Sequence, residues 1–210
     1  MRPPGGDATD EELWRRSADH DGAAFGLLFE RHVNAVYNHC FRRTASWSRA
    51  EDLTSVVFLE LWRQRSRVRL DGDSILPWLF GVANNVIRNA DRSLRRYHRL
   101  LIKLATVGPP QAPADEDFGQ RVDDERSMAH ILEAVSTLRT EEQEVVALCD
   151  WANLTYAEAA ASLDVPIGTI RSRLSRAHEH LRETIDRDGN RWRQPLLSPP
   201  HPSKENDGVP

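Results

Sequence analysis

Residues 155–177 read TYAEAAASLDVPIGTIRSRLSRA, a stretch with the signals of two short helices joined by a turn. Thr155 can cap the first helix, and Glu158, three residues later, completes a capping box. Asp164 stands at the turn position, and Asp tolerates the left-handed backbone better than most residues. Pro166 blocks continuation of the first helix, so the second is expected to start around 167–169. The stretch therefore predicts a helix-turn-helix.

The second helix of this motif has an apolar face and a polar face. Ile170 and Leu174 are four residues apart and are expected to face the core. The outward face offers donors for base edges and phosphates, from Arg171, Ser172, Ser175 and Arg176. The alternative is an ordinary helical hairpin with a charged surface. The coincidence of cap, turn, proline and polar face favours a helix that reads DNA.

Charge is distributed unevenly along the 210 residues, although the whole chain carries a net charge of only −4. Residues 63–103 hold ten Lys or Arg and three acids, a net of +7, and residues 168–182 have a net of +3. The stretch between them, 109–126, contains prolines and has a net of −4. The arginine runs alone could be solvated helix faces. Together, the two basic stretches indicate two modules that each meet a polyanion.

Helical spacing of apolar residues recurs along the chain, without an alternating strand pattern or an internal repeat. It predicts helices over about 23–43, 49–64 and 77–96, a short helical piece at 100–104, and further helices across 123–186. Residues 65–74 read as a loop. We therefore predict an all-α fold of two small helical domains, 10–100 and 123–187. A flexible acidic linker, 106–122, is expected to join them, and the proline-rich tail, 188–210, to be disordered.

The sequence lacks the usual signatures of catalysis, cofactors and membranes. There is no P-loop, GxGxxG, HExxH or supported Ser/His/Asp arrangement, so we expect no enzyme activity, no catalytic residues, no cofactor and no metal. Cys40 and Cys149 lie far apart and outside any CxxC spacing, which argues against a disulfide framework or a zinc site. No signal peptide or apolar run of roughly 18 residues is present, so a cytoplasmic protein without membrane contact is expected.

The helix expected around residues 52–62 carries more apolar bulk than one buried stripe uses. With Val57 and Leu61 facing inward, Phe58 and Trp62 fall on a different face. An exposed apolar patch beside acids such as Asp52 is typical of a surface that binds a protein partner. A fully buried central helix is the alternative.

The next helix combines aromatic, amide and guanidinium groups. These residues are Trp78, Asn84, Asn85, Arg88, Asn89 and Arg92. Such groups suit stacking on unpaired bases and contact with backbone phosphates. The alternative is an amphipathic helix that is merely soluble.

Taken in order, these segments resemble a bacterial sigma factor of the extracytoplasmic-function (ECF) group within the sigma-70 family. The similarity covers roughly residues 20–97 and 128–185. In the first part it rests on AEDLT at 50–54 with Phe58 and Trp62, and on Trp78-Leu79 with Ala83-Asn84-Asn85. In the second part it rests on LTYAE at 154–158 and on GTIRSRLSRA at 168–177, which is close to the family's GTV-x-SRL-x-RA signature.

The resemblance implies a promoter-specificity subunit that binds RNA polymerase core (its β and β′ subunits), recognises the −35 and −10 elements of promoter DNA and promotes DNA opening. Domain 10–100 would be sigma region 2 and domain 123–187 would be sigma region 4. Core polymerase would contact Glu51, Asp52, Leu53, Phe58 and Trp62. The −10 element would contact the loop 65–74 and Trp78, Asn84, Asn85, Arg88, Asn89 and Arg92. The −35 element would contact Thr169, Arg171, Ser172, Ser175 and Arg176. An anti-sigma factor is a further partner that the resemblance allows.

The chain departs from the family pattern at several positions. Ser55-Val56 stands where the family usually has Gln-Glu, so core binding is expected to depend more on apolar contact. Arg139 replaces a usual Pro, Ala159 a usual Ile, and Asn89 a common Asp, the last of which affects the −10 preference.

A second function remains open from the residues alone. The chain could be a stand-alone helix-turn-helix regulator whose N-terminal module senses a ligand through an aromatic pocket. Such a regulator, if dimeric, should bind a two-fold symmetric operator unaided. A sigma factor should bind promoter DNA weakly alone and tightly with core polymerase.

Overall fold

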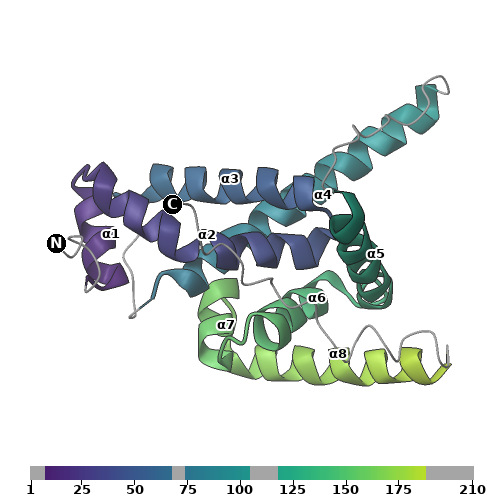
Figure 1. The fold of residues 1–210 in the computed structure, drawn as a ribbon. Coiled ribbons are helices and arrows are strands. Elements are labelled where there is room, and N and C mark those ends of the chain that lie inside the picture. Colours follow the sequence, from purple (N-terminus) through teal and green to yellow (C-terminus); the bar gives the residue numbers. More distant parts are fainter. Residues whose placement is uncertain (1–7, 68–73, 105–117, 188–210) are drawn as a thin grey trace.

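The computed structural model describes residues 8–67, 74–104 and 118–187, and within these ranges every regular element is helical (Figure 1). The all-α prediction is confirmed. In chain order the elements are α1 (Asp10–Ala18), α2 (Gly22–Thr44), α3 (Trp47–Gln64), α4 (Leu76–Leu104), α5 (Phe118–Val135), α6 (Thr140–Val146), the π-helical turn η1 (Ala147–Trp151), α7 (Tyr156–Leu163) and α8 (Ile167–Arg187). None of the helices within the described ranges is long and apolar enough to cross a membrane.

The helix starts follow from short polar side chains. Asp21 accepts hydrogen bonds from the amides of Ala23 and Ala24 and so caps α2, and Ser46 caps α3 through the amide of Arg49. Helix α1 was not predicted, although Thr9 caps it and three acids occupy its first turn. Its charged sequence obscures an apolar stripe that is visible only once Leu13 and Trp14 are seen to be buried.

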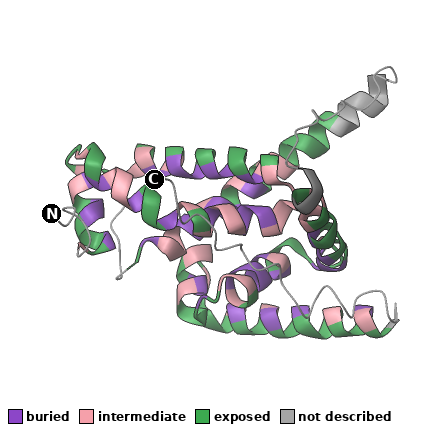
Figure 2. Cartoon of the chain, in the orientation of Figure 1, coloured by how far each residue is buried: buried purple, intermediate pink, exposed green. Residues whose placement is uncertain are grey.

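The N-terminal half of the structure, residues 8–104, is built around α2, α3 and α4 (Figures 1 and 2). Val36 on α2, Val57 and Leu61 on α3, and Leu79 on α4 are all fully buried. The inward positions predicted for Val57 and Leu61 are therefore confirmed. Removing this apolar surface from water is the main force that holds the half together.

The C-terminal half, residues 118–187, packs directly against the N-terminal half (Figure 1). Helix α7 lies on the first turns of α4, where Ser162 Oγ donates a hydrogen bond to the Pro77 carbonyl at 2.6 Å. Other hydrogen bonds also join the halves: Arg42 donates to the Trp151 carbonyl, and Glu125 accepts from the Trp47 amide at 2.7 Å. Helix α5 begins inside the 106–122 stretch expected to be a linker, and residues 105–117 and 188–210 lie outside the described residues.

The glycine at position 81 permits this close packing of α4 and α7. A Cβ atom at Gly81 would overlap the backbone carbonyl oxygen of Ser162 and would lie 3.3 Å from its carbonyl carbon. Gly81 is buried within α4, where glycine costs about 0.5–1 kcal/mol relative to alanine. The packing between the halves thus depends on a residue that the helix itself disfavours.

A buried histidine links α2 to α4. The Nε2 atom of His39 lies 3.0 Å from the side-chain oxygen of Asn84 and donates to it, and the His39 ring packs on Phe80. Burial lowers the pKa of His39 to about 4, because the charged form would lose its hydration. The imidazole is therefore neutral in the folded chain at neutral pH.

This histidine makes stability depend on pH in a defined direction. The unfolded chain takes up a proton on His39 near pH 6.5, whereas the folded chain does so only near pH 4. The contribution is fully present above pH 6.5 and is lost as the pH falls, by about 2 kcal/mol between pH 7 and pH 5. Urea unfolding at both pH values should show this loss. His39→Gln should reduce it and His130→Gln, at an exposed position, should not; parallel profiles for the two variants would contradict the assignment.

Candidate nucleic-acid and polymerase interfaces

The helix-turn-helix predicted from residues 155–177 is confirmed in its local geometry. Thr155 Oγ1 accepts from the Glu158 amide at 3.2 Å, and Glu158 Oε2 accepts from the Thr155 amide at 2.8 Å, which completes the capping box. Asp164 ends α7 in the left-handed region, with φ 52° and ψ 51°. Helix α8 then begins at Ile167, directly after Pro166.

Helix α8 presents the predicted polar face to solvent. Arg171, Ser172, Ser175 and Arg176 are exposed, and Thr169 is half-buried. Ile170 and Leu174, at 0% and 5% exposure, face the core as predicted. The Arg171 guanidinium lies 6.0 Å from the ring centre of Tyr156, which is exposed on α7. Tyr156 was not predicted to be part of this surface, although its place in the first turn of α7 could have indicated it.

The candidate −10 residues on α4 fall on two different faces. Asn85, Arg88, Asn89 and Arg92 are exposed, whereas Asn84 is only 2% exposed. Asn84 shares a stripe with the buried Phe80 and Ile87, at spacings of four and three residues, and this places it in the core. The structure therefore corrects the expectation that Asn84 is available to DNA, and its side-chain oxygen instead accepts from His39.

Trp78 and Arg88 are both engaged within the folded chain. Trp78 is half-buried, and its ring centre lies 6.1 Å from that of Trp14 on α1. Arg88 donates from Nε and Nη2 to Glu144 Oε1 on α6, at 3.1 and 2.5 Å, and the Glu144 side chain is almost completely buried. A groove of about 390 Å³ beside this ion pair is lined by Arg88, Arg92, Arg95, Thr140 and Glu141. Three arginines of α4, at positions 88, 92 and 95, therefore line a groove between α4 and α6 of the C-terminal half.

The candidate polymerase-binding residues on α3 are also divided between surface and core. Glu51 and Asp52 are exposed, but Leu53 and Phe58 are 7% and 5% exposed. Phe58 packs edge-on against Phe29, with ring centres 4.8 Å apart. The expectation that Phe58 forms an exposed patch is corrected, because on a helix it turns toward the α2 side of the buried stripe.

Trp62 is half-buried rather than fully exposed. Its ring lies 4.9 Å from Phe25 in an edge-on arrangement, and the Arg65 guanidinium lies 3.9 Å from its centre. The exposed apolar residues of α3 are instead Val56 and Leu59, at 42% and 47% exposure. Together with Asp52, they form a surface at spacings of three and four residues, which we call the α3 outer face.

Comparison with known proteins gives a family match for each half of the chain. Residues 28–97 match the family model "Sigma-70 region 2", and residues 129–181 match "Sigma-70, region 4". The chain is 31% identical over 167 residues to the RNA polymerase sigma factor CarQ of Myxococcus xanthus, covering 79% of this chain and 92% of that protein. It is 26% identical over 185 residues to the ECF RNA polymerase sigma factor SigK of Mycobacterium tuberculosis, covering 88% and 97%.

Among solved structures, CnrH in complex with the cytosolic domain of CnrY has a similar fold. The TM-score is 0.64 at 23% identity, covering 86% of this chain and 99% of that chain. The two matched regions include residues from every described helix except α1. The chain therefore belongs to the sigma-70 family and, within it, to the ECF group of RNA polymerase sigma factors.

Proposed function

We propose that this chain, as the promoter-specificity subunit of RNA polymerase, uses three separate surfaces: α8 for the −35 element, α4 for the −10 element and the α3 outer face for the polymerase core. The observation that carries the proposal is the capped helix-turn-helix with its exposed arginine face. It lies in a chain whose two halves both match sigma-70 family models. Transcription from promoter DNA by core polymerase, with and without the purified chain, tests it.

The α8 surface suits duplex DNA. Arg171 and Arg176 can reach base edges or phosphates from the exposed face, while Thr169 stands in the first turn, where amide groups face outward. Ser172 and Ser175 add short donors between them. A helix of this kind fits the major groove, which is the reason to assign it the −35 element.

The α4 surface suits an opened strand. Asn85, Asn89 and Arg92 are exposed and can contact unpaired base edges and phosphates. Trp78, which is half-buried, adds an aromatic group to this surface. We leave Asn84 out of this surface because it is buried and hydrogen-bonded to His39.

Use of Arg88 by DNA requires its ion pair with Glu144, which joins the two halves, to break. Arg88 is bound to the buried carboxylate of Glu144, so a DNA phosphate and Glu144 compete for the same guanidinium. We propose that the chain is closed when free and opens on core polymerase, with two domains at about 10–100 and 123–187. An anti-sigma factor that stabilised the closed form would keep Arg88 away from DNA.

The stand-alone regulator is the less favoured function. Both halves match sigma-70 regions, and this favours a sigma factor over a ligand-sensing regulator. We further propose that the chain works in the cytoplasm with the polymerase, without a cofactor and without enzyme activity of its own. Tight binding to a symmetric operator in the absence of core polymerase would reverse this preference.

Replacement of Arg171 or Arg176 by alanine tests the α8 assignment. Each change should cost about 1–3 kcal/mol in binding of the holoenzyme to promoter DNA that contains the −35 element. Association with core polymerase should stay unchanged, because α8 does not form the α3 outer face. Arg15→Ala, which removes an exposed arginine from α1, is the matched control for charge. Equal losses of DNA binding and core association would contradict the assignment.

A further inference from the structure

Helix α1 lies outside the part of the chain that matches sigma-70 region 2, which begins at residue 28. It nevertheless joins the same core, where Leu13 is fully buried and Trp14 is 4% exposed. A nine-residue helix is marginal by itself, so tertiary contacts must hold it in place. Those contacts converge on the start of α4.

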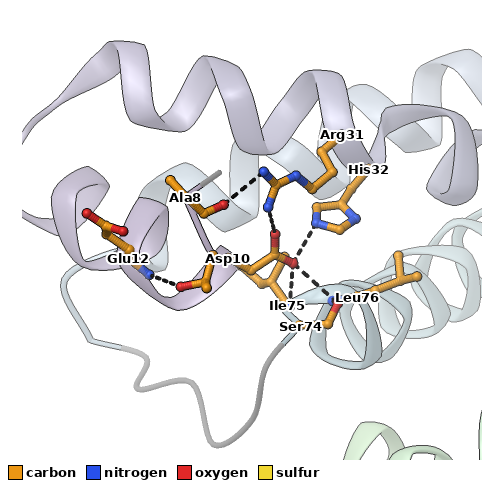
Figure 3. A network of polar contacts seen from close by, with 9 residues as sticks. Ala8, Asp10, Glu12, Arg31, His32, Ser74, Ile75 and Leu76 are labelled. Carbon is orange, nitrogen blue, oxygen red and sulfur yellow. Dashed lines mark hydrogen bonds and ion pairs between the residues drawn. The ribbon is translucent and has the colours of Figure 1, made fainter. Parts of the chain in front are cut away.

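Asp10 is the centre of these contacts (Figure 3). Its side chain is 4% exposed, and its Oδ1 atom accepts from Arg31 Nη1 at 2.6 Å. Its Oδ2 atom accepts from three donors: His32 Nε2 at 2.7 Å, the Ile75 amide at 3.0 Å and Ser74 Oγ at 3.3 Å. One carboxylate thus connects α1, α2 and the two residues that directly precede α4.

The hydrogen bonds also keep this carboxylate charged. Burial raises the pKa of Asp10, but the hydrogen bonds from Ile75, Arg31 and His32, with the charge of His32, outweigh burial and lower the pKa overall. A charged carboxylate makes stronger hydrogen bonds than a neutral group. Asp10 is therefore ionised at neutral pH and accepts these hydrogen bonds as a carboxylate.

Asp10 acts as the cap of α4, although it comes from a different helix. The first amide groups of a helix have no partner within the helix. The Ile75 amide donates to Asp10, which is 65 positions away in the sequence, and the Leu76 amide donates to Ser74 Oγ at 3.2 Å. The position of the first turn of α4 is thereby set by α1.

A second contact holds the same turn. The Trp14 and Trp78 rings pack at 46° with centres 6.1 Å apart. Trp78 stands in the first turn of α4 and is the aromatic member of the surface proposed to contact the −10 element. Both contacts therefore end on the part of α4 that would meet the opened strand.

We propose that α1 positions the −10-reading helix and that Asp10 is the positioning residue, an inference that rests on the proposed function of α4. Asp10 does not touch DNA. It fixes the first turn of α4, so that the DNA-contacting side chains are in place before the duplex opens. Without it, the holoenzyme assembles but opens the promoter slowly.

Asp10→Asn tests the proposal in the reconstituted holoenzyme, with Glu11→Gln on the exposed side of α1 as the matched control. An amide can accept fewer of the four hydrogen bonds, so opening of a duplex promoter should be at least about tenfold slower. Binding to core polymerase, to duplex −35 DNA and to a template already opened over the −10 element should stay within about twofold. Equal losses in all four measurements, or no loss of opening, would overturn the proposal.

Hydrogen exchange of the free chain separates this inference from the proposed function. Asp10→Asn should speed exchange of the Ile75 and Leu76 amides about tenfold and leave the α8 amides unchanged. Unchanged exchange at residues 75–76 overturns the positioning role, whereas failure of the wild-type chain to direct transcription overturns the proposed function alone. Ser74→Ala, at an exposed position, covers the case in which Asp10→Asn does not fold. Ser74→Ala should also slow promoter opening by the holoenzyme, and opening at the wild-type rate would overturn the proposal.

Discussion

Replacement of Gly81 by alanine is expected to separate the two halves of the free chain. The added methyl group would overlap the Ser162 backbone carbonyl, and neither helix backbone can move aside without disturbing the Ser162–Pro77 hydrogen bond. Overpacking of this kind costs about 1–3 kcal/mol. If the closed and open forms exchange as proposed, that cost lowers the ratio of closed to open chains roughly 5- to 150-fold.

Small-angle scattering and limited proteolysis would measure the separation, through a larger radius of gyration and faster cleavage between residues 105 and 117. Opening also frees Arg88 from Glu144, so the affinity of the free chain for single-stranded −10 DNA should rise. Gly26→Ala on α2 is the matched control, because no atom beyond the adjoining backbone of its own helix lies within 4 Å of a Cβ there. It should stabilise the chain slightly and leave its dimensions unchanged. A compact Gly81→Ala chain would show that the α4–α7 packing has room that the structure does not indicate.

Replacement of both Val56 and Leu59 by serine is expected to cause the largest loss of polymerase binding. The two side chains are 42% and 47% exposed, so folding should change by only about 0.5 kcal/mol. If the α3 outer face is the contact with core polymerase, two apolar anchors of this kind are worth about 2 kcal/mol or more, roughly a 30-fold loss of affinity.

Titration of labelled core polymerase would measure this affinity. Leu94→Ser, at a similarly exposed apolar residue of α4, is the control and should bind normally. Phe58→Ala provides the contrast within α3: its side chain is 5% exposed, so the variant should lose about 3–5 kcal/mol of stability. Normal core binding by the serine variant would place the polymerase contact elsewhere.

The helix-turn-helix could be predicted from the sequence almost completely. Its capping box, left-handed Asp164 and start of α8 depend on groups only a few residues apart, so the local sequence contains the whole interaction. The same reason explains why Ile170 and Leu174 could be assigned to the core. The bounds of α2 and α3 also came within two residues, because their periodicity is strong.

Predictions that required knowing which face of a helix is covered were less accurate. Asn84 and Phe58 were expected to be available to partners, yet both are buried, because each lies where a second helix packs against its own. Composition indicated an amide and an aromatic on these helices. It could not indicate that His39 packs against Asn84 or that Phe29 packs against Phe58.

The sequence by itself determined most of the helices other than α1, the helix-turn-helix and the family, since these depend on contacts within a turn or two of chain and on motifs read in order. Only the tertiary structure decided that Asp10 caps α4, that Glu144 holds Arg88 and that Gly81 admits α7. Each of these joins residues at least 56 positions apart in the sequence. No local pattern encodes such a pairing, because it depends on how whole helices pack to bury their apolar faces.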